Sequence, residues 1–396
     1  MLVYLDNNAT TAVAPEVFHA MRPFLADFYG NPSSMHFFGG QVKKYVTRAR
    51  EQVAELLGAH PDEIIFTAGG SEGDNLAIKG AAEALAGQKN HIVTSRVEHP
   101  AVRETCRVLG KRGWRLTEIG VDRDGQLDMG ALEEALTPDT ALVSIMWANN
   151  ETGVLFPIEK IAEMTRARGI IFHTDAVQAV GKVAIDVRNT PLDLLSLSGH
   201  KLHAPKGIGA LYVRRGTRLI PQIHGGHQEG GKRAGTENVP GIVALGAAAE
   251  LALKNMREEN ERVRRLRDKL EEGLLKSCPG AKVNGKNRLP NTLNISFEFI
   301  EGESILLMLS DLGICASSGS ACTSGSLEPS HVLRAMGVPF TLAHGSVRFS
   351  LSRYNTEQEI DYVLEHMPKI VKKLRDISPF VNQPPQSWGG KHTCSV

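Results

Sequence analysis

Ile64-Ile65-Phe66-Thr67-Ala68-Gly69-Gly70-Ser71 is a short apolar run that ends in small residues. Its first half predicts a buried strand, and the small residues predict a turn into a helix beginning near Glu72. Before this stretch, apolar residues recur at helical spacing from Val42 to Leu57, and Gly58 follows as a stop signal. A helix, a buried strand and a second helix in this order indicate an α/β layer structure.

The same alternation continues through the first two-thirds of the chain. Helical stretches lie between many of the further strand candidates, which are His91 to Ser95, Leu142 to Trp147, Ile170 to Thr174, Leu194 to Leu197 and Gly209 to Val213. Buried strands that alternate with helices indicate a mostly parallel sheet. We therefore expect a large α/β domain over residues 15–256.

The composition changes near Met256. Residues 257–276 are dense in charge, and four apolar residues share one face of the expected helix: Val263, Leu266, Leu270 and Leu274. A solvated helix that leads into a second domain is the favoured interpretation, and a nucleic-acid-binding helix is the alternative. We assign residues 1–14 and 257–377 to a smaller α+β domain, and residues 378–396 to a loosely ordered tail.

Composition excludes several classes of protein. Hydrophobic residues make up 42% of the 396 residues, and the formal net charge is +1. A net charge this small does not attract the protein as a whole to nucleic acid or to anionic lipid. The chain does not open on a secretory signal, and no run approaches the roughly 18 apolar residues of a membrane span. The five cysteines include no C-x-x-C pair, which disfavours a disulfide framework or a four-sulfur zinc site. We predict a cytoplasmic protein without direct nucleic-acid or membrane partners.

A lysine and a carboxylate follow two of the predicted strands. Lys201 lies in Ser198-Gly199-His200-Lys201, where partial burial would favour the neutral, nucleophilic amine. The ordinary alternative is an exposed loop lysine, and Lys206 is a nearby competitor. Asp175 could hold a proton on a heterocyclic nitrogen or could cap the next helix. Gln178, three residues further on, could reach a ring hydroxyl.

Other strand ends carry groups that suit a phosphate and a flat ring. Backbone N–H groups at Gly69-Gly70-Ser71 and the positive end of the next helix suit a phosphate, although any tight connection can use such a turn. The turn matches neither G-x-G-x-x-G nor a P-loop, which disfavours a dehydrogenase or an NTPase. His99 could stack on a ring or be structural, and Asn149-Asn150 is a polar loop at the same edge. Together with the lysine and the aspartate, these groups meet the requirements of pyridoxal phosphate (PLP).

A cysteine and an arginine add two further candidates. Cys322 lies in a run of small polar residues, and we expect a mobile loop over about 317–330 that carries an accessible thiol. Cys315, after an apolar stretch, fits a structural cysteine better. Arg348 lies in a predicted strand and could bind a carboxylate or face outward, and Arg353 is its competitor.

Several segments together resemble the cysteine desulfurases of the NifS/IscS type, within the fold-type I, class V aminotransferase-like PLP enzymes. The resemblance runs from Leu2 to about Ile377. Its matching segments are residues 4–11, Gly30-Asn31-Pro32-Ser33-Ser34, Glu98-His99-Pro100-Ala101-Val102, Asn149-Asn150-Glu151-Thr152-Gly153, residues 173–178, Ser198-Gly199-His200-Lys201, Gly235-Thr236 and Ser318-Gly319-Ser320-Ala321-Cys322. It implies a seven-stranded, mostly parallel sheet.

The resemblance also implies a role for each candidate. Lys201 would bond the cofactor and move the substrate α-proton, and Cys322 would accept sulfur as a persulfide. His99 would stack on the ring and assist proton transfer, and Arg348 would bind the substrate carboxylate. The remaining implied cofactor contacts are Asp175 to the pyridine nitrogen, Gln178 to the ring oxygen, Asn150 to the cofactor oxygen and the substrate, Gly70, Ser71, Ser198 and His200 to the phosphate, and Thr236 to the phosphate of the partner subunit.

The implied activity removes sulfur from L-cysteine and passes it to an acceptor such as an iron–sulfur cluster scaffold protein, within a homodimer. Gly70-Ser71 departs from the Ala-Thr frequent in the family, although serine keeps the hydroxyl. The tail also departs, which leaves the acceptor open. A selenocysteine lyase or an aminotransferase is the nearest alternative. A metal-binding protein would use the paired histidines of residues 200–203 and 224–227, and a non-catalytic sulfur carrier or RNA-binding module is a third class.

Overall fold

The predicted first strand forms β2 (Ile64–Thr67), and the helix after it, α4 (Gly70–Ala84), begins two residues earlier than expected. The structure is a computed structural model that describes residues 1–318 and 329–379. Its other strands are β1 (Val3–Tyr4), β3 (His91–Ser95), β4 (Arg115–Ile119), β5 (Thr140–Ser144), β6 (Ile171–Asp175), β7 (Leu194–Ser198), β8 (Gly209–Val213), β9 (Ala281–Val283), β10 (Thr292–Phe297), β11 (Ile314–Cys315) and β12 (Ser346–Ser350). Its other α-helices are α1 (Pro15–Met21), α2 (Pro23–Ala26), α3 (Phe37–Leu57), α5 (Pro100–Lys111), α6 (Met129–Ala135), α7 (Ile158–Arg166), α8 (Val239–Ser277), α9 (Gly302–Asp311), α10 (His331–Ala335), α11 (Phe340–Ala343) and α12 (Glu357–Ile377), with short 3-10 helices η1 (Pro61–Glu63), η2 (Gly199–Lys201) and η3 (Gln228–Gly231).

Seven strands form the central sheet in the order β2-β8-β7-β6-β5-β3-β4. Neighbouring strands are parallel except around β8, which runs antiparallel to both β2 and β7. This confirms the expected mostly parallel, seven-stranded sheet. β4 was absent from the sequence prediction because its charged residues, Arg115 and Glu118, interrupt the apolar run and the strand lies at the edge of the sheet.

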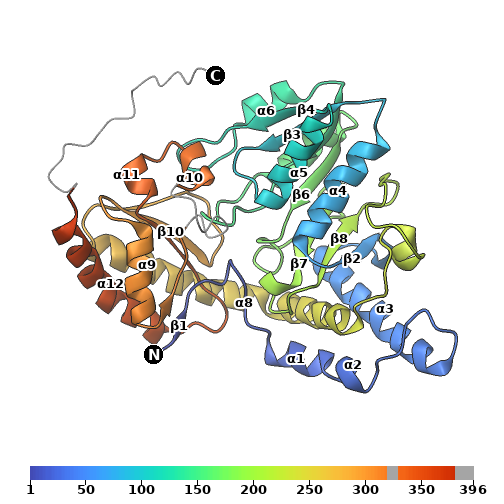
Figure 1. Ribbon diagram of the computed structural model, residues 1–396, viewed down its shortest axis with the longest axis horizontal. Helices are drawn as coiled ribbons and strands as arrows, with labels where there is room; N and C mark the ends of the chain where they lie inside the picture. Colours follow the sequence, from blue (N-terminus) through green and yellow to red (C-terminus); the bar gives the residue numbers. More distant parts are fainter. Residues whose placement is uncertain (319–328, 380–396) are drawn as a thin grey trace.

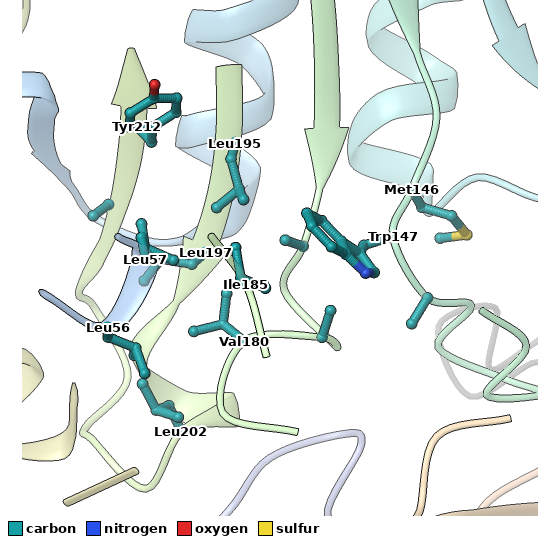
Figure 2. Packing of buried hydrophobic residues seen from close by; sticks show 14 of the residues in the cluster. Leu56, Leu57, Met146, Trp147, Val180, Ile185, Leu195, Leu197, Leu202 and Tyr212 are labelled. Carbon is teal, nitrogen blue, oxygen red and sulfur yellow. The ribbon is translucent and has the colours of Figure 1, made fainter. Parts of the chain in front are cut away.

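Helices cover both faces of this sheet (Figure 1). Alternate strand residues pack against one face or the other. Leu194 and Leu211 pack with α4 and α5 on one face. Leu195 and Tyr212 pack with α3, α7 and α8 on the other. Figure 2 shows part of this second packing layer, to which Leu195, Leu197 and Tyr212 of the sheet contribute together with Leu57 and Ile185. Because both faces are buried, these strands are apolar along their whole length rather than alternating.

A second cluster of buried side chains lies beyond the sheet. It combines β1 with the antiparallel sheet β12-β10-β9 and with α9, α12 and the second half of α8. Val263, Leu266, Leu270 and Leu274, the predicted apolar face, are all buried in it. The first half of α8 packs in the core beside the large sheet instead. α8 therefore contributes to both clusters, its first half to one and its second half to the other.

The helix predicted over residues 257–276 is longer than expected, because α8 already begins at Val239. Nothing in the backbone stops it at the change in composition, so one 39-residue helix joins the two clusters (Figure 1). By length and composition α8 is also apolar enough to cross a membrane, and half of its most apolar window is buried inside the protein.

Candidate active site

Five strands bring the candidate residues to one edge of the sheet. β2, β3, β5, β6 and β7 run in the same direction, so the segments after them leave at the same edge. Gly70, His99, Asn150, Asp175 and Lys201 each lie at the end of one of these strands or in the segment that follows it. Ligands of open α/β sheets collect at this edge.

Lys201 is the last residue of η2, directly after β7, and it is half-buried. Its Nζ donates hydrogen bonds to the backbone oxygens of Asn8, at 2.5 Å, and Ala9, at 2.6 Å. The N-terminal segment is held here by a bond from the Thr11 backbone N–H to the His200 carbonyl at 2.9 Å. Sequence reasoning did not assign Asn8 to the site, although it lies in a matching polar segment.

Asp175 and His99 interact electrostatically with each other and with Lys201. Burial raises the pKa of the Asp175 carboxyl, whereas His99, a hydrogen bond from the Val177 backbone and Lys201 oppose that rise. Burial lowers the pKa of His99, and Asp175 partly offsets this effect. His99 Nδ1 accepts from the Ala101 backbone N–H at 3.2 Å. When the ring is neutral, its proton therefore lies on Nε2, for which residues 1–318 and 329–379 offer no hydrogen-bond partner.

The turn at Gly69-Gly70 forms the start of α4 without a capping side chain from the described residues. Its first N–H groups are therefore available to an anion. A Cβ at Gly69 would lie 3.8 Å from Ser198 Oγ, so the hydroxyl of Ser198 is beside this turn. A Cβ at Gly70 would lie 2.6 Å from Val177 Cγ2, so a larger residue at this position would require the Val177 side chain to shift. Ser71 is exposed in the first turn.

His200, Gln178 and Thr236 have different surroundings. His200 is half-buried with Nδ1 3.2 Å from Thr10 Oγ1, and burial together with nearby lysines lowers its pKa to about 4. Gln178 is buried and donates to the Asn8 carbonyl at 3.0 Å. Thr236 is exposed in the segment between η3 and α8, and among the described residues it makes no hydrogen bond with Lys201, Asp175 or His99.

Arg348 lies on β12 in the second cluster, and its side chain is buried. The interpretation of an outward-facing surface arginine is therefore wrong. Its Nη2 lies 2.7 Å from Asp6 Oδ1, and its Nη1 donates to the Asn150 carbonyl at 2.9 Å. Its Nε is buried and has no acceptor within residues 1–318 and 329–379. A buried guanidinium with an unused donor is suited to a carboxylate ligand.

Two buried glutamates belong to the site region and were missed as functional candidates. Burial raises the pKa of Glu98 to about 8, against hydrogen bonds from the Ser95 hydroxyl and the Met146 backbone. Burial raises the pKa of Glu151 to about 7. Both glutamates lie in segments that carry the family resemblance, Glu98-His99-Pro100 and Asn149-Asn150-Glu151. The burial of their carboxyls, however, depends on residues far away in the chain.

Cys322 and the central part of the predicted mobile loop lie outside the described residues, as does most of the tail. The segment before it is attached to the site, because Ser317 pairs with Arg348 through backbone hydrogen bonds of 2.7 and 3.2 Å. Cys106 and Cys278 are buried, and burial raises the pKa of both thiols. In the described part of the chain, no group of three or more His, Cys, Asp or Glu side chains could hold a metal ion.

This fold and this strand-end site define a class of protein. The chain matches the aminotransferase class-V family over residues 3–363 and belongs to that family, whose members are PLP-dependent enzymes. It is 61% identical to a cysteine desulfurase of Trichormus azollae, with 96% of both chains covered. It is 58% identical to the cysteine desulfurase NifS of Azotobacter vinelandii, with 96% of this chain and 94% of that chain covered.

The fold of the chain is also similar to that of solved structures. A NifS-like protein superposes with a TM-score of 0.89 at 40% identity, covering 94% of this chain and all of that chain. A structure of SspA in complex with cysteine superposes with a TM-score of 0.81 at 39% identity, covering 89% of this chain and all of that chain. The similarity extends over both clusters of buried side chains, because the matched lengths include nearly the whole described chain.

Proposed function

We propose that this chain is a cysteine desulfurase, which converts L-cysteine into L-alanine and retains the sulfur as a persulfide on Cys322. The observation that carries the proposal is the position of Lys201, Asp175 and His99 at one sheet edge, beside an uncapped helix N-terminus. The relatives named cysteine desulfurase and the structure of SspA with cysteine support the choice of substrate.

The residues at this edge fit PLP. Lys201 would bond its aldehyde carbon, and the buried Asp175 would hold the pyridine proton. The phosphate would bind the first N–H groups of α4 with Ser71, Ser198 and His200, and Gly70 leaves the backbone accessible there. When bound, PLP supplies an electron sink that weakens bonds at the substrate α-carbon. Among the residues that would complete the contacts are Gln178, Asn150 and, from the partner subunit, the exposed Thr236.

The chain's own groups would then bind the substrate and move its protons. Arg348 would direct its unused Nε toward the substrate carboxylate while Asp6 fixes the orientation of the guanidinium. Lys201 would remove the α-proton, and the neutral His99 would exchange protons through Nε2. Before PLP binds, the backbone oxygens of Asn8 and Ala9 hold the lysine amine at the sheet edge.

Sulfur transfer would need one further nucleophile. The Cys322 thiolate attacks the substrate sulfur, so that an S–S bond forms and the Cβ–S bond breaks. The electron pair remains on the carbon, which takes up a proton and becomes the methyl group of L-alanine. L-cysteine and the enzyme thiol thus give L-alanine and the enzyme persulfide without an external oxidant.

A homodimer is part of this proposal. Exposed apolar side chains lie on α1, on α2, in the segment between α2 and α3, and at the start of α3: Phe18, Leu25, Tyr29, Met35 and Phe37. Grouped apolar exposure of this kind is typical of a protein interface. Phe37→Glu should yield a monomer by light scattering, whereas Leu307→Glu, at an exposed apolar residue of α9, should remain dimeric. A monomeric wild-type protein would contradict the proposal.

The persulfide would pass to an acceptor protein in the cytoplasm, and an iron–sulfur cluster scaffold is the proposed acceptor. The name NifS of one relative supports a role in this direction. Mixing the persulfide form with a purified scaffold protein and iron should transfer labelled sulfur to the scaffold. Retention of the label on Cys322 would exclude that acceptor.

Two variants test the activity itself. Lys201→Ala should abolish the visible absorbance of the PLP-bound protein, whereas Lys206→Ala should retain it. Cys322→Ser should retain bound PLP but lose persulfide formation from L-cysteine. Cys315→Ser should retain both bound PLP and persulfide formation. A new amino acid formed when a keto acid is added, in place of alanine with persulfide, would indicate an aminotransferase instead.

A further inference from the structure

We infer that Ser330 and Glu151 are positioning residues, which hold the end of the Cys322 segment against the PLP site and so keep the thiol within reach of the substrate sulfur. This inference rests on the proposed function. The carboxyl of Glu151 is buried beside the site and takes no part in the proposed cofactor contacts, so its role would be to accept the hydrogen bond from Ser330.

The hydroxyl of Ser330 connects two parts of the fold. It donates a hydrogen bond to Glu151 Oε2, in the segment after β5. The same oxygen accepts from the backbone N–H groups of Val332, at 3.1 Å, and Leu333, at 3.3 Å, and so caps α10. Both Ser330 and Glu151 are 4% exposed. Every hydrogen-bonding position of this hydroxyl is therefore used, in a place that water does not reach.

The next residue makes a second contact with the site. His331 Nε2 lies 3.0 Å from the backbone oxygen of Glu98, directly before His99. Because a backbone oxygen only accepts, the ring nitrogen donates this bond. Two consecutive residues thus attach the start of α10 to the segment after β3 and to the segment after β5. These segments carry His99 and Asn150, which lie at the same sheet edge as Lys201.

The opposite end of the Cys322 segment is attached independently. Ser317 pairs with Arg348, as described above. Cys322 is five residues from Ser317 and eight from Ser330, and extended chain spans at most about 3.5 Å per residue. The described contacts therefore attach the chain on both sides of the segment that carries the proposed nucleophile. Losing the Ser330 hydroxyl removes one of the two attachments at this end and leaves that of His331. We expect this loss to lower the effective concentration of the thiol at the substrate.

This reasoning separates the sulfur-transfer step from substrate binding. Losing the anchor should slow attack by Cys322 but leave the binding of L-cysteine to PLP and Arg348 intact. A misplacement of about 1 Å can cost about a hundredfold in rate. We expect at least a tenfold loss in the rate of persulfide formation for Ser330→Ala.

The test uses the PLP-bound protein in single turnovers with L-cysteine and no reductant. Mass spectrometry follows the persulfide on Cys322, and visible absorbance follows substrate binding. Ser330→Ala should slow the persulfide tenfold or more while the absorbance step stays within about twofold of wild type. Ser330→Thr and Glu151→Gln, which keep the hydroxyl and an acceptor oxygen, should recover most of the rate. The matched control is Thr356→Ala, which removes the side-chain cap of α12 and should change neither readout.

A double-mutant cycle then asks whether Ser330 acts through the thiol. In a Cys322→Ser background with dithiothreitol as acceptor, adding Ser330→Ala should leave the rate of alanine formation unchanged. A loss equal to that in the wild-type background would show a general effect on the site and overturn the inference. So would a wild-type persulfide rate in Ser330→Ala. A wild-type protein that forms neither alanine nor persulfide would instead overturn the proposed function, and the inference with it.

Discussion

Replacing Gly70 by alanine should disturb the PLP site through a single contact with Val177. A Cβ at this position would lie 2.6 Å from Val177 Cγ2, whereas carbon atoms pack best at about 3.5–4.0 Å. One of the two groups must therefore move by about 1 Å. Overpacking of this size costs about 1–3 kcal/mol, and the higher helix propensity of alanine returns at most about 1 kcal/mol.

The displacement should reach the cofactor contacts on both sides. Gly70 opens α4, whose first N–H groups are the proposed phosphate site. The Val177 backbone N–H donates to Asp175 Oδ1 at 2.9 Å, so a shift of Val177 also moves the carboxyl proposed for the pyridine nitrogen. If this strain makes the free energy of PLP binding less favourable by about 2 kcal/mol, Gly70→Ala weakens the affinity for PLP about 30-fold.

The assay is a fluorescence titration of apoprotein with PLP, with urea unfolding of the same variants. Val177→Ala removes the clashing Cγ2 methyl group, so the double variant should bind PLP within about threefold of wild type. Gly110→Ala is the control, since a Cβ there meets no atom within 4 Å, and its PLP affinity should not change. Unchanged affinity in Gly70→Ala, or no recovery in the double variant, would contradict the proposed cradle.

Two further variants test buried charge. The carboxyl of Glu98 has a pKa of about 8 in the folded protein and an ordinary value when unfolded, so the folded state binds the extra proton. Stability should therefore fall as pH rises from about 6 to 8, by up to about 1.4 kcal/mol per pH unit, and urea unfolding of Glu98→Gln should show a smaller fall. Arg348→Gln leaves Asp6 without its partner, and we expect a loss of about 2 kcal/mol in unfolding free energy together with a KM for L-cysteine at least tenfold higher. Equal pH slopes, or an unchanged KM, would count against these assignments.

The large sheet could be predicted from the sequence because its signals are local. Each buried strand is an apolar run between helical stretches, and the order of these elements indicates a parallel sheet. Parallel strands bring their carboxyl ends to one edge, so Lys201, Asp175 and His99 could be grouped although none of them is near another in the chain. The edge strand β4 was missed for the converse reason, since its charged residues give no apolar run.

Contacts between the two clusters of buried side chains could not be predicted in this way. Nothing near Lys201 in the chain indicates that the carbonyls of Asn8 and Ala9 accept its hydrogen bonds, or that Asp6 pairs with Arg348. The contact of Ser330 with Glu151 likewise joins residues 179 positions apart. Hydrophobic periodicity records which face of each element is buried, but not which distant segment covers it. The packing of the smaller cluster and of the N-terminal segment against the sheet edge therefore determines which distant residues complete the site.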